Sequence, residues 1–294
     1  MVARRPSIPS VRGPHVESSH RTRTRKSTAA NETTAPRDEP TQPILLDVVG
    51  SVAHLTLNRP HRSNAIDLPT ARAFARAVAE IEQLPHLKAV LLRAEGADFC
   101  VGGDLSAMAV AADTGAFAAE LAEQMHRALS RLAGLAIPVV GAVQGAAAGA
   151  GLGLVLAADL VLCAESARFR TAYSGVGLSP DCGVSYWLPR VIGTGRALQM
   201  LLSNKVVDAD TAWEWGLVGA IVPNAELDSH ATAVVSSLVQ ESAPALGQAR
   251  RLVRAAPSRS LDAHLGDEAA TIALLAGGTD ARERIGSFVV GRRA

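Results

Sequence analysis

The sequence predicts a soluble α/β protein, and three observations support that class. Between residues 44 and 222, short runs typical of β-strands alternate with patterns typical of helices. After Val222 the strand signals stop, so residues 223–294 are expected to form a helical lid or oligomerisation region. Residues 1–43 hold six prolines and eleven Ser/Thr but few large apolar side chains, which predicts a disordered basic tail.

The core is expected to open with two strands, a helix and a third strand. The runs ILLDVV and VAHLTL flank Gly50–Ser51, which is the arrangement of a hairpin. Apolar residues then recur at helical spacing from Leu68 to Ile81, and Pro85 ends that pattern. The apolar run AVLLRA at 89–94 is typical of a buried strand.

The alternation then continues along the chain. A loop at 95–104 precedes a helical pattern that extends to about Leu135, and Pro138–Val143 is the next expected strand. A helix from about Gly149 and a strand at Leu160–Cys163 complete the series. Repeated β-α alternation implies parallel strands joined by right-handed crossovers.

Composition excludes several classes of protein. The 29 basic and 28 acidic residues leave a net charge of +1, and 48% of the residues are hydrophobic, so the chain is not a disordered polyelectrolyte. No apolar run is long enough to cross a membrane. Three cysteines without a CxxC pair argue against a disulfide framework or a metal site, and they favour the reducing cytoplasm. The tail carries eight basic against four acidic residues, and an inert extension is favoured over a targeting segment or an anion-binding arm.

Two glycine-rich loops follow predicted strands, where ligands of α/β proteins collect. The loop at 98–105 contains Gly102–Gly103, and glycines at 145, 149, 151 and 153 run into a helix. This series lacks GxGxxG spacing, which argues against a dinucleotide site. Close helix–strand packing remains an alternative reading, but two such loops favour an oxyanion hole built from backbone N–H groups.

Four motifs stand in series along the chain: Asn58–Pro60 with Asn64–Ala65, Phe99–Leu105, Pro138–Gly145 with the glycines that follow, and Ala158–Asp159. In order and spacing they resemble the crotonase (enoyl-CoA hydratase/isomerase) superfamily. The resemblance implies a ββα spiral core, homotrimers or hexamers, and a CoA thioester substrate. It also implies that the thioester oxygen is held by the N–H groups of Val101 and Ala150.

Hydratases of this superfamily carry two glutamates that activate water, and neither is present. By position they fall on Gly153 and Tyr173, and a phenol with an ordinary pKa near 10 is a poor base at neutral pH. The loop Ser179–Gly183 instead resembles the acid-bearing loop of the branch that includes enoyl-CoA isomerases and 1,2-epoxyphenylacetyl-CoA isomerases. Asp181 is therefore the expected catalytic acid/base, and an N-cap for the helix that begins near Gly183 is the alternative.

The resemblance also supplies a set of expected substrate-binding positions: Arg59, Arg62, Ala65, Gly103, Asp104, Gly149, Gly153 and Tyr173. Arg59 and Arg62 are expected to face the CoA phosphates. Gly153, together with Ala146–Ala148, is expected to leave room for an acyl chain or ring. Asp104 belongs to a family motif but is expected to stabilise its loop more than to move protons.

The predicted activity is an acyl-CoA isomerase that converts 3-enoyl-CoA to 2-enoyl-CoA, or a related ring-epoxide isomerase, with no metal or cofactor. Alternatives are an enoyl-CoA hydratase of fatty-acid or aromatic degradation and a non-catalytic CoA- or RNA-binding homologue. Nucleic-acid binding is disfavoured because the basic tail has no interleaved aromatic residues. His126 has no partner pattern and is interpreted as a structural or surface residue, and Cys182 as a packing residue.

Overall fold

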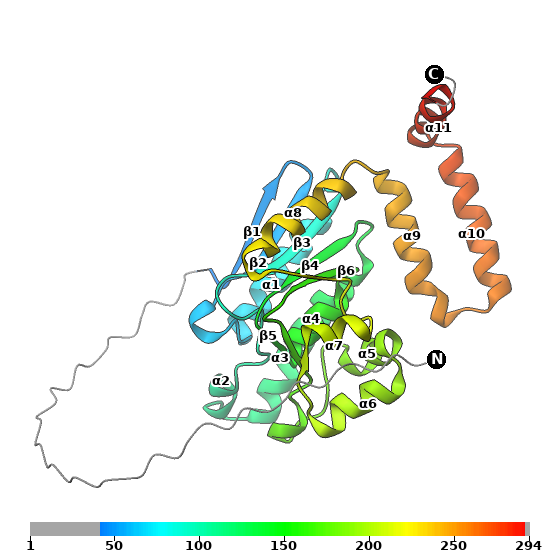
Figure 1. Cartoon of the computed structure of the whole chain (residues 1–294). Helices are drawn as coiled ribbons and strands as arrows, with labels where there is room; N and C mark the ends of the chain where they lie inside the picture. Colours follow the sequence, from blue (N-terminus) through cyan, green and yellow to red (C-terminus); the bar gives the residue numbers. More distant parts are fainter. Residues whose placement is uncertain (1–41, 292–294) are drawn as a thin grey trace, which may run out of the picture. The chain divides into compact units, whose positions relative to one another are not determined.

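A computed structural model describes residues 42–291 of the chain (Figure 1). The prediction of a disordered tail at 1–43 therefore falls almost wholly outside the described residues. The described residues belong to one compact unit. No helix among them is both long and apolar enough to span a membrane.

The main sheet has six strands in the order β1-β2-β3-β4-β6-β9. Their bounds are β1 Ile44–Val49, β2 Val52–Leu57, β3 Ala89–Ala94, β4 Val139–Val143, β6 Leu160–Ala164 and β9 Ala220–Val222. The first two strands form the predicted antiparallel hairpin, with Ile44 opposite Leu57, and every later pairing is parallel. The predicted α/β class is thus confirmed.

A second sheet was not predicted. It contains β5 (Ala146–Ala148), β7 (Arg168–Arg170) and β8 (Val207–Asp208), in that order. Each strand has only two or three residues, which is too short to show the alternation by which strands are recognised. The strand β5 lies inside the glycine-rich loop and also bridges to Cys100, so the sheet brings the two glycine-rich loops together.

Helices connect the strands and cover the sheet. The α-helices are α1 Leu68–Glu82, α2 Leu105–Ala109, α3 Thr114–Gly134, α4 Ala150–Ala157, α5 Val184–Ile192, α6 Thr194–Ser203, α7 Ala209–Glu214, α8 Leu227–Leu238, α9 Ala243–Ala255, α10 Leu261–Ala276 and α11 Thr279–Gly291. Short 3₁₀ helices are η1 Pro60–Arg62, η2 Ser174–Val176, η3 Asn224–Glu226 and η4 Ala256–Ser258. The helical pattern predicted up to Leu135 is divided in two, because the Asp113 carboxylate accepts from Ala116 N–H and starts α3.

The helix α4 occupies the centre of the core. All eight of its residues are buried, as expected for a helix that is apolar on every side. It follows Gly149, whose φ of 53° lies in the left-handed region that favours glycine. The chain therefore turns sharply from β5 into α4, and the first N–H groups of α4 emerge beside the loop at 98–105.

The C-terminal helices do not form a separate body that begins at residue 223. The helix α8 lies over the sheet (Figure 1). Its residues Leu227, Ala231 and Val235 pack in one cluster with Leu91 and Val140. The helix α9 is joined to the core by ion pairs, and α10 packs on α9 and α11 on α10. Several large apolar side chains of the last two helices are exposed: Leu261, Leu265, Ile272, Leu274, Ile285 and Val290.

Candidate active site

A cavity of about 280 Å³ lies where the two glycine-rich loops, α3 and the segment at 172–182 meet. Six of the residues predicted for the site line it: Val101, Gly103, Gly149, Ala150, Tyr173 and Asp181. Most of the other lining side chains are aliphatic or methionine, including Leu121 and Met125 of α3. Among the described residues that line the cavity, Asp181 is the only carboxylate.

Asp181 is held by Tyr173, the residue that the family resemblance places at the position of a hydratase glutamate. The Tyr173 hydroxyl donates to Oδ1 of Asp181 at 2.7 Å. Burial first, and then the charge of Asp181, raise the pKa of Tyr173 far above its ordinary value, so the phenol stays protonated and keeps donating. The helix-cap alternative for Asp181 is wrong, because Gly183 is the N-cap of α5 and no side chain caps that end.

One of the two predicted oxyanion donors is well placed. Ala150 is the first residue of α4, it lines the cavity, and no acceptor in the described part of the chain meets its N–H. The first N–H groups of a helix lack partners within the helix and carry the positive end of its dipole. The start of α4 is therefore suited to an oxygen that gains negative charge.

The second predicted donor is engaged elsewhere in this structure. The Val101 N–H donates to the carbonyl oxygen of Ser63 at 3.1 Å, although the Val101 side chain lines the cavity. A thioester oxygen would have to compete with that carbonyl. The oxyanion role of Val101 therefore stays a prediction, and it requires a small rearrangement at Ser63.

The prediction that Arg59 faces CoA is wrong. Arg59 is only 4% exposed, and its guanidinium donates to the Ala65 carbonyl at 2.7 Å and pairs with Asp104 at 3.3 Å and Asp67 at 3.2 Å. A cation enclosed by two carboxylates holds loops together and cannot reach a solvent-exposed phosphate. Arg62 is exposed and lies outside the cavity lining.

Asp104 and Ala65 therefore belong to the framework of the site. The Asp104 carboxylate accepts from the N–H groups of Ser106 and Ala107 and so caps α2, as its expected loop role implies. Neither Asp104 nor Ala65 lines the cavity, and both are buried. Their assignment to substrate binding is not supported by this geometry.

Gly153 does not leave room for an acyl group. A Cβ placed there would lie 2.6 Å from the Cys182 carbonyl oxygen and 2.7 Å from the Cys182 Cβ. The space beside Gly153 is thus filled by the loop that carries Asp181, and neither Gly153 nor Ala146–Ala148 lines the cavity. Glycine is needed at 153 for close packing of α4 on that loop.

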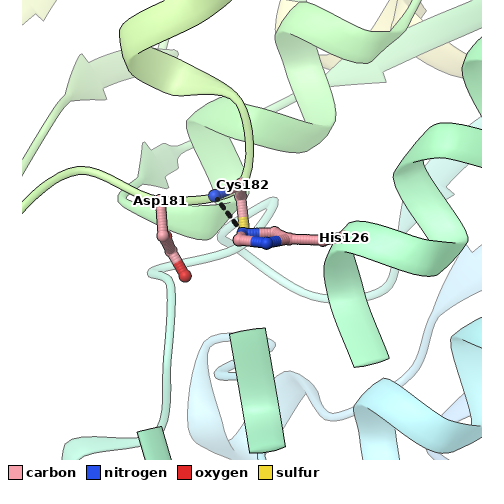
Figure 2. A group of neighbouring side chains, drawn as sticks. All are labelled: His126, Asp181 and Cys182. Carbon is pink, nitrogen blue, oxygen red and sulfur yellow. Dashed lines mark hydrogen bonds between the residues drawn. The ribbon is translucent and has the colours of Figure 1, made fainter. Parts of the chain in front are cut away.

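His126, interpreted from the sequence as a structural or surface residue, is exposed and does not line the cavity, but it contacts the turn that carries Asp181. Figure 2 shows its ring reaching from α3 to the turn at Asp181 and Cys182, where Nε2 accepts from the Cys182 N–H at 3.1 Å. The sequence shows only that Ala118, Ala122 and His126 follow one another at i, i+4 spacing, and the structure is needed to show that Ala118 and Ala122 line the cavity.

His126, Asp181 and Cys182 also offer ligand atoms within 4.8 Å of one another. The Nε2 lone pair is already used by the Cys182 N–H, and Oδ1 of Asp181 accepts from Tyr173. Burial raises the pKa of the Cys182 thiol well above its usual range, so the sulfur stays protonated and packs. Two of the atoms that a metal ion would need are therefore engaged in hydrogen bonds within the protein.

In this fold the N-terminus of α4 and the carboxylate-bearing Asp181 line one largely apolar cavity. The chain belongs to the enoyl-CoA hydratase/isomerase family, whose model, described as "Enoyl-CoA hydratase/isomerase", matches residues 47–290. This confirms the resemblance seen in the motifs.

Individual relatives carry different reaction names. The chain is 34% identical over 253 residues to 1,2-epoxyphenylacetyl-CoA isomerase of Escherichia coli K12, covering 85% of this chain and 96% of that protein. It is 32% identical to a probable enoyl-CoA hydratase of Rhodobacter capsulatus, covering 84% and 94%. The crystal structure of an enoyl-CoA hydratase from Polaromonas sp. JS666 superimposes with a TM-score of 0.80 at 30% identity, covering 84% and 97%.

Proposed function

We propose that this protein is an acyl-CoA isomerase that moves a double bond from the 3,4 to the 2,3 position of an enoyl-CoA. The observation that carries this proposal is that Asp181 is the one carboxylate among the described residues lining an apolar cavity, which the N-terminus of α4 also lines. Proton transfer between two carbons of one substrate needs one base that can accept and return a proton. Addition of water needs further groups to activate that water.

Asp181 is the proposed base. Tyr173 holds Oδ1, which leaves the second carboxylate oxygen to take a proton from C2 of the substrate. The electron pair of that C–H bond moves into the thioester, and the resulting enolate oxygen is met by the Ala150 N–H, with Val101 as the second donor. Asp181 then returns the proton at C4, and the double bond becomes conjugated with the carbonyl. The chemistry as proposed uses neither metal nor cofactor.

Isomerisation of a ring epoxide is a related reaction that belongs to the same proposal. It is supported by the identity with a relative named as such an isomerase. Both reactions use an acyl-CoA thioester as the substrate and fit the reducing cytoplasm, where the three free, buried cysteines would persist.

Enoyl-CoA hydration is the second candidate function, favoured by the name of another relative. Against it, the two positions expected to carry glutamates hold Gly153, which packs on Cys182, and Tyr173, which stays protonated. Isomerisation is favoured because neither group can act as a base toward water.

The decisive assay presents the purified protein with 3-enoyl-CoA and, separately, with 2-enoyl-CoA. We expect 2-enoyl-CoA to form from the first substrate and no 3-hydroxyacyl-CoA to form from the second. Asp181→Asn keeps the size of the side chain and an acceptor for Tyr173 but removes the base, so kcat should fall roughly 100-fold or more.

The matched control is Asp47→Asn, because Asp47 is an exposed carboxylate of β1 outside the cavity. It should retain the wild-type rate. Near wild-type isomerisation by a folded Asp181→Asn protein would refute the catalytic assignment. Efficient hydration of 2-enoyl-CoA by the wild type would favour the second candidate.

A further inference from the structure

The turn that carries Asp181 has an unusual backbone. The Val184 N–H donates to the Asp181 carbonyl at 3.0 Å, and the two residues between them, Cys182 and Gly183, have φ values of 48° and 74°. Turns with two left-handed central residues normally contain Gly, Asn or Asp there. Cys182 has none of the features that make this conformation easy, so the turn is strained.

Such a turn persists only if its surroundings hold it. On one side Gly153 of α4 lacks a Cβ, which admits the Cys182 carbonyl and Cβ at close range. On the other side Nε2 of His126 accepts the Cys182 N–H at 3.1 Å. Cys182 is 1% exposed, so bulk water does not offer its N–H another acceptor.

The Cys182 N–H belongs to the peptide group that directly follows Asp181. Fixing that peptide group fixes the position of the Asp181 Cα and so restricts the direction in which its side chain leaves the backbone. The Tyr173 hydroxyl fixes the far end of the same side chain through Oδ1. Asp181 is thus held at both ends, by Tyr173 and by His126, from two segments that are separate in the sequence.

We infer that His126 is a positioning residue: by accepting the Cys182 N–H (Figure 2) it holds the strained turn, and so aims the Asp181 carboxylate into the cavity. The inference rests on the proposed role of Asp181 as the base. Because Nε2 is the acceptor, the neutral His126 ring carries its proton on Nδ1. His126 itself does not touch the reacting carbon atoms in this assignment.

The test compares two substitutions at one position. His126→Gln keeps a side-chain acceptor near the Cys182 N–H, whereas His126→Leu has a similar volume and no acceptor. Displacement of a catalytic group by about 1 Å can cost on the order of 100-fold in rate. We expect His126→Leu to lower kcat for 3-enoyl-CoA isomerisation roughly 10- to 100-fold with KM within about two-fold of wild type. His126→Gln should recover most of the rate, and Ser130→Ala on the exposed side of α3 should match the wild type.

A second readout does not depend on activity. Hydrogen–deuterium exchange of the Cys182 amide, measured without substrate, should become faster in His126→Leu and stay near the wild-type rate in His126→Gln and Ser130→Ala. If the wild type does not isomerise 3-enoyl-CoA but exchange responds as expected, the proposed function fails and the hold of His126 on the turn stands.

Unchanged exchange in His126→Leu would overturn the inference. It would also be overturned by faster exchange with no loss of kcat in an active enzyme, because the hydrogen bond would then not position the base. Equal losses in the Gln and Leu variants, at an unchanged melting temperature, would likewise show that the acceptor is not what matters.

Discussion

Adding a single methyl group at Gly153 should disturb the turn that carries Asp181. In Gly153→Ala the new Cβ would lie 2.6 Å from the Cys182 carbonyl oxygen, 2.7 Å from its Cβ and 3.3 Å from its carbonyl carbon. Two of these three atoms are backbone atoms, which cannot rotate away as a flexible side chain could. Either α4 or the turn at Cys182 must move, and Asp181 is the residue next to Cys182.

The change in unfolding free energy of Gly153→Ala is the sum of two opposing contributions. Replacing glycine by alanine within a helix stabilises it by about 1 kcal/mol. Overpacking a tight core contact costs about 1–3 kcal/mol. Gly195→Ala in α6 provides the matched control, because nothing lies within 4 Å of a Cβ placed there. The two variants should therefore differ in unfolding free energy by about 1–3 kcal/mol, with Gly153→Ala the less stable.

Thermal unfolding and isomerase assays on the two variants test this reasoning. At about 2–4 °C per kcal/mol, the melting temperature of Gly153→Ala should lie roughly 2–12 °C below that of Gly195→Ala. If Asp181 is the base as proposed, kcat should fall at least about ten-fold because the turn that carries Asp181 is displaced. If Gly153→Ala is as stable as the control and fully active, the close packing of α4 on the turn is not what requires glycine.

Three further results are expected. Asp159→Ala should lower the unfolding free energy measured in urea by about 3–5 kcal/mol. The reason is that the buried Arg250 guanidinium, which lies 2.6 Å from the Asp159 carboxylate, would lose that partner. A loss under about 1 kcal/mol would contradict this. Burial raises the pKa values of the Cys100 and Cys163 thiols to about 12 and that of the Cys182 thiol still higher. At pH 8 a thiol reagent should therefore modify the folded protein only slowly and should label three thiols after unfolding. One fast-reacting thiol in the folded protein would contradict this. The exposed apolar side chains of α10 and α11 favour association of several copies of the chain. We expect sedimentation experiments to show a homotrimer or hexamer, and a stable, active monomer would argue against this.

Local patterns were sufficient for most of the main sheet. The strand predicted at 89–94 coincides with β3, and the hairpin turn at Gly50–Ser51 lies between β1 and β2 as expected. These elements depend on periodicity and on turn residues, which are properties of a few neighbouring positions. The strands β5, β7 and β8 were missed because two or three residues carry no periodicity, and only pairing with distant segments makes them strands.

The sequence by itself determined the family, because the order and spacing of its motifs can be matched without coordinates. It also singled out Asp181 and Tyr173, which line one cavity. Only the tertiary structure decided how four other residues are used. Arg59 is enclosed by carboxylates rather than open to phosphate, and Gly153 packs on a turn rather than lining a cavity. His126 meets Cys182 across 56 positions of sequence, and Val101 donates to Ser63. Burial and hydrogen-bond partners arise from segments far apart in the chain, so the pattern around a single residue does not contain them.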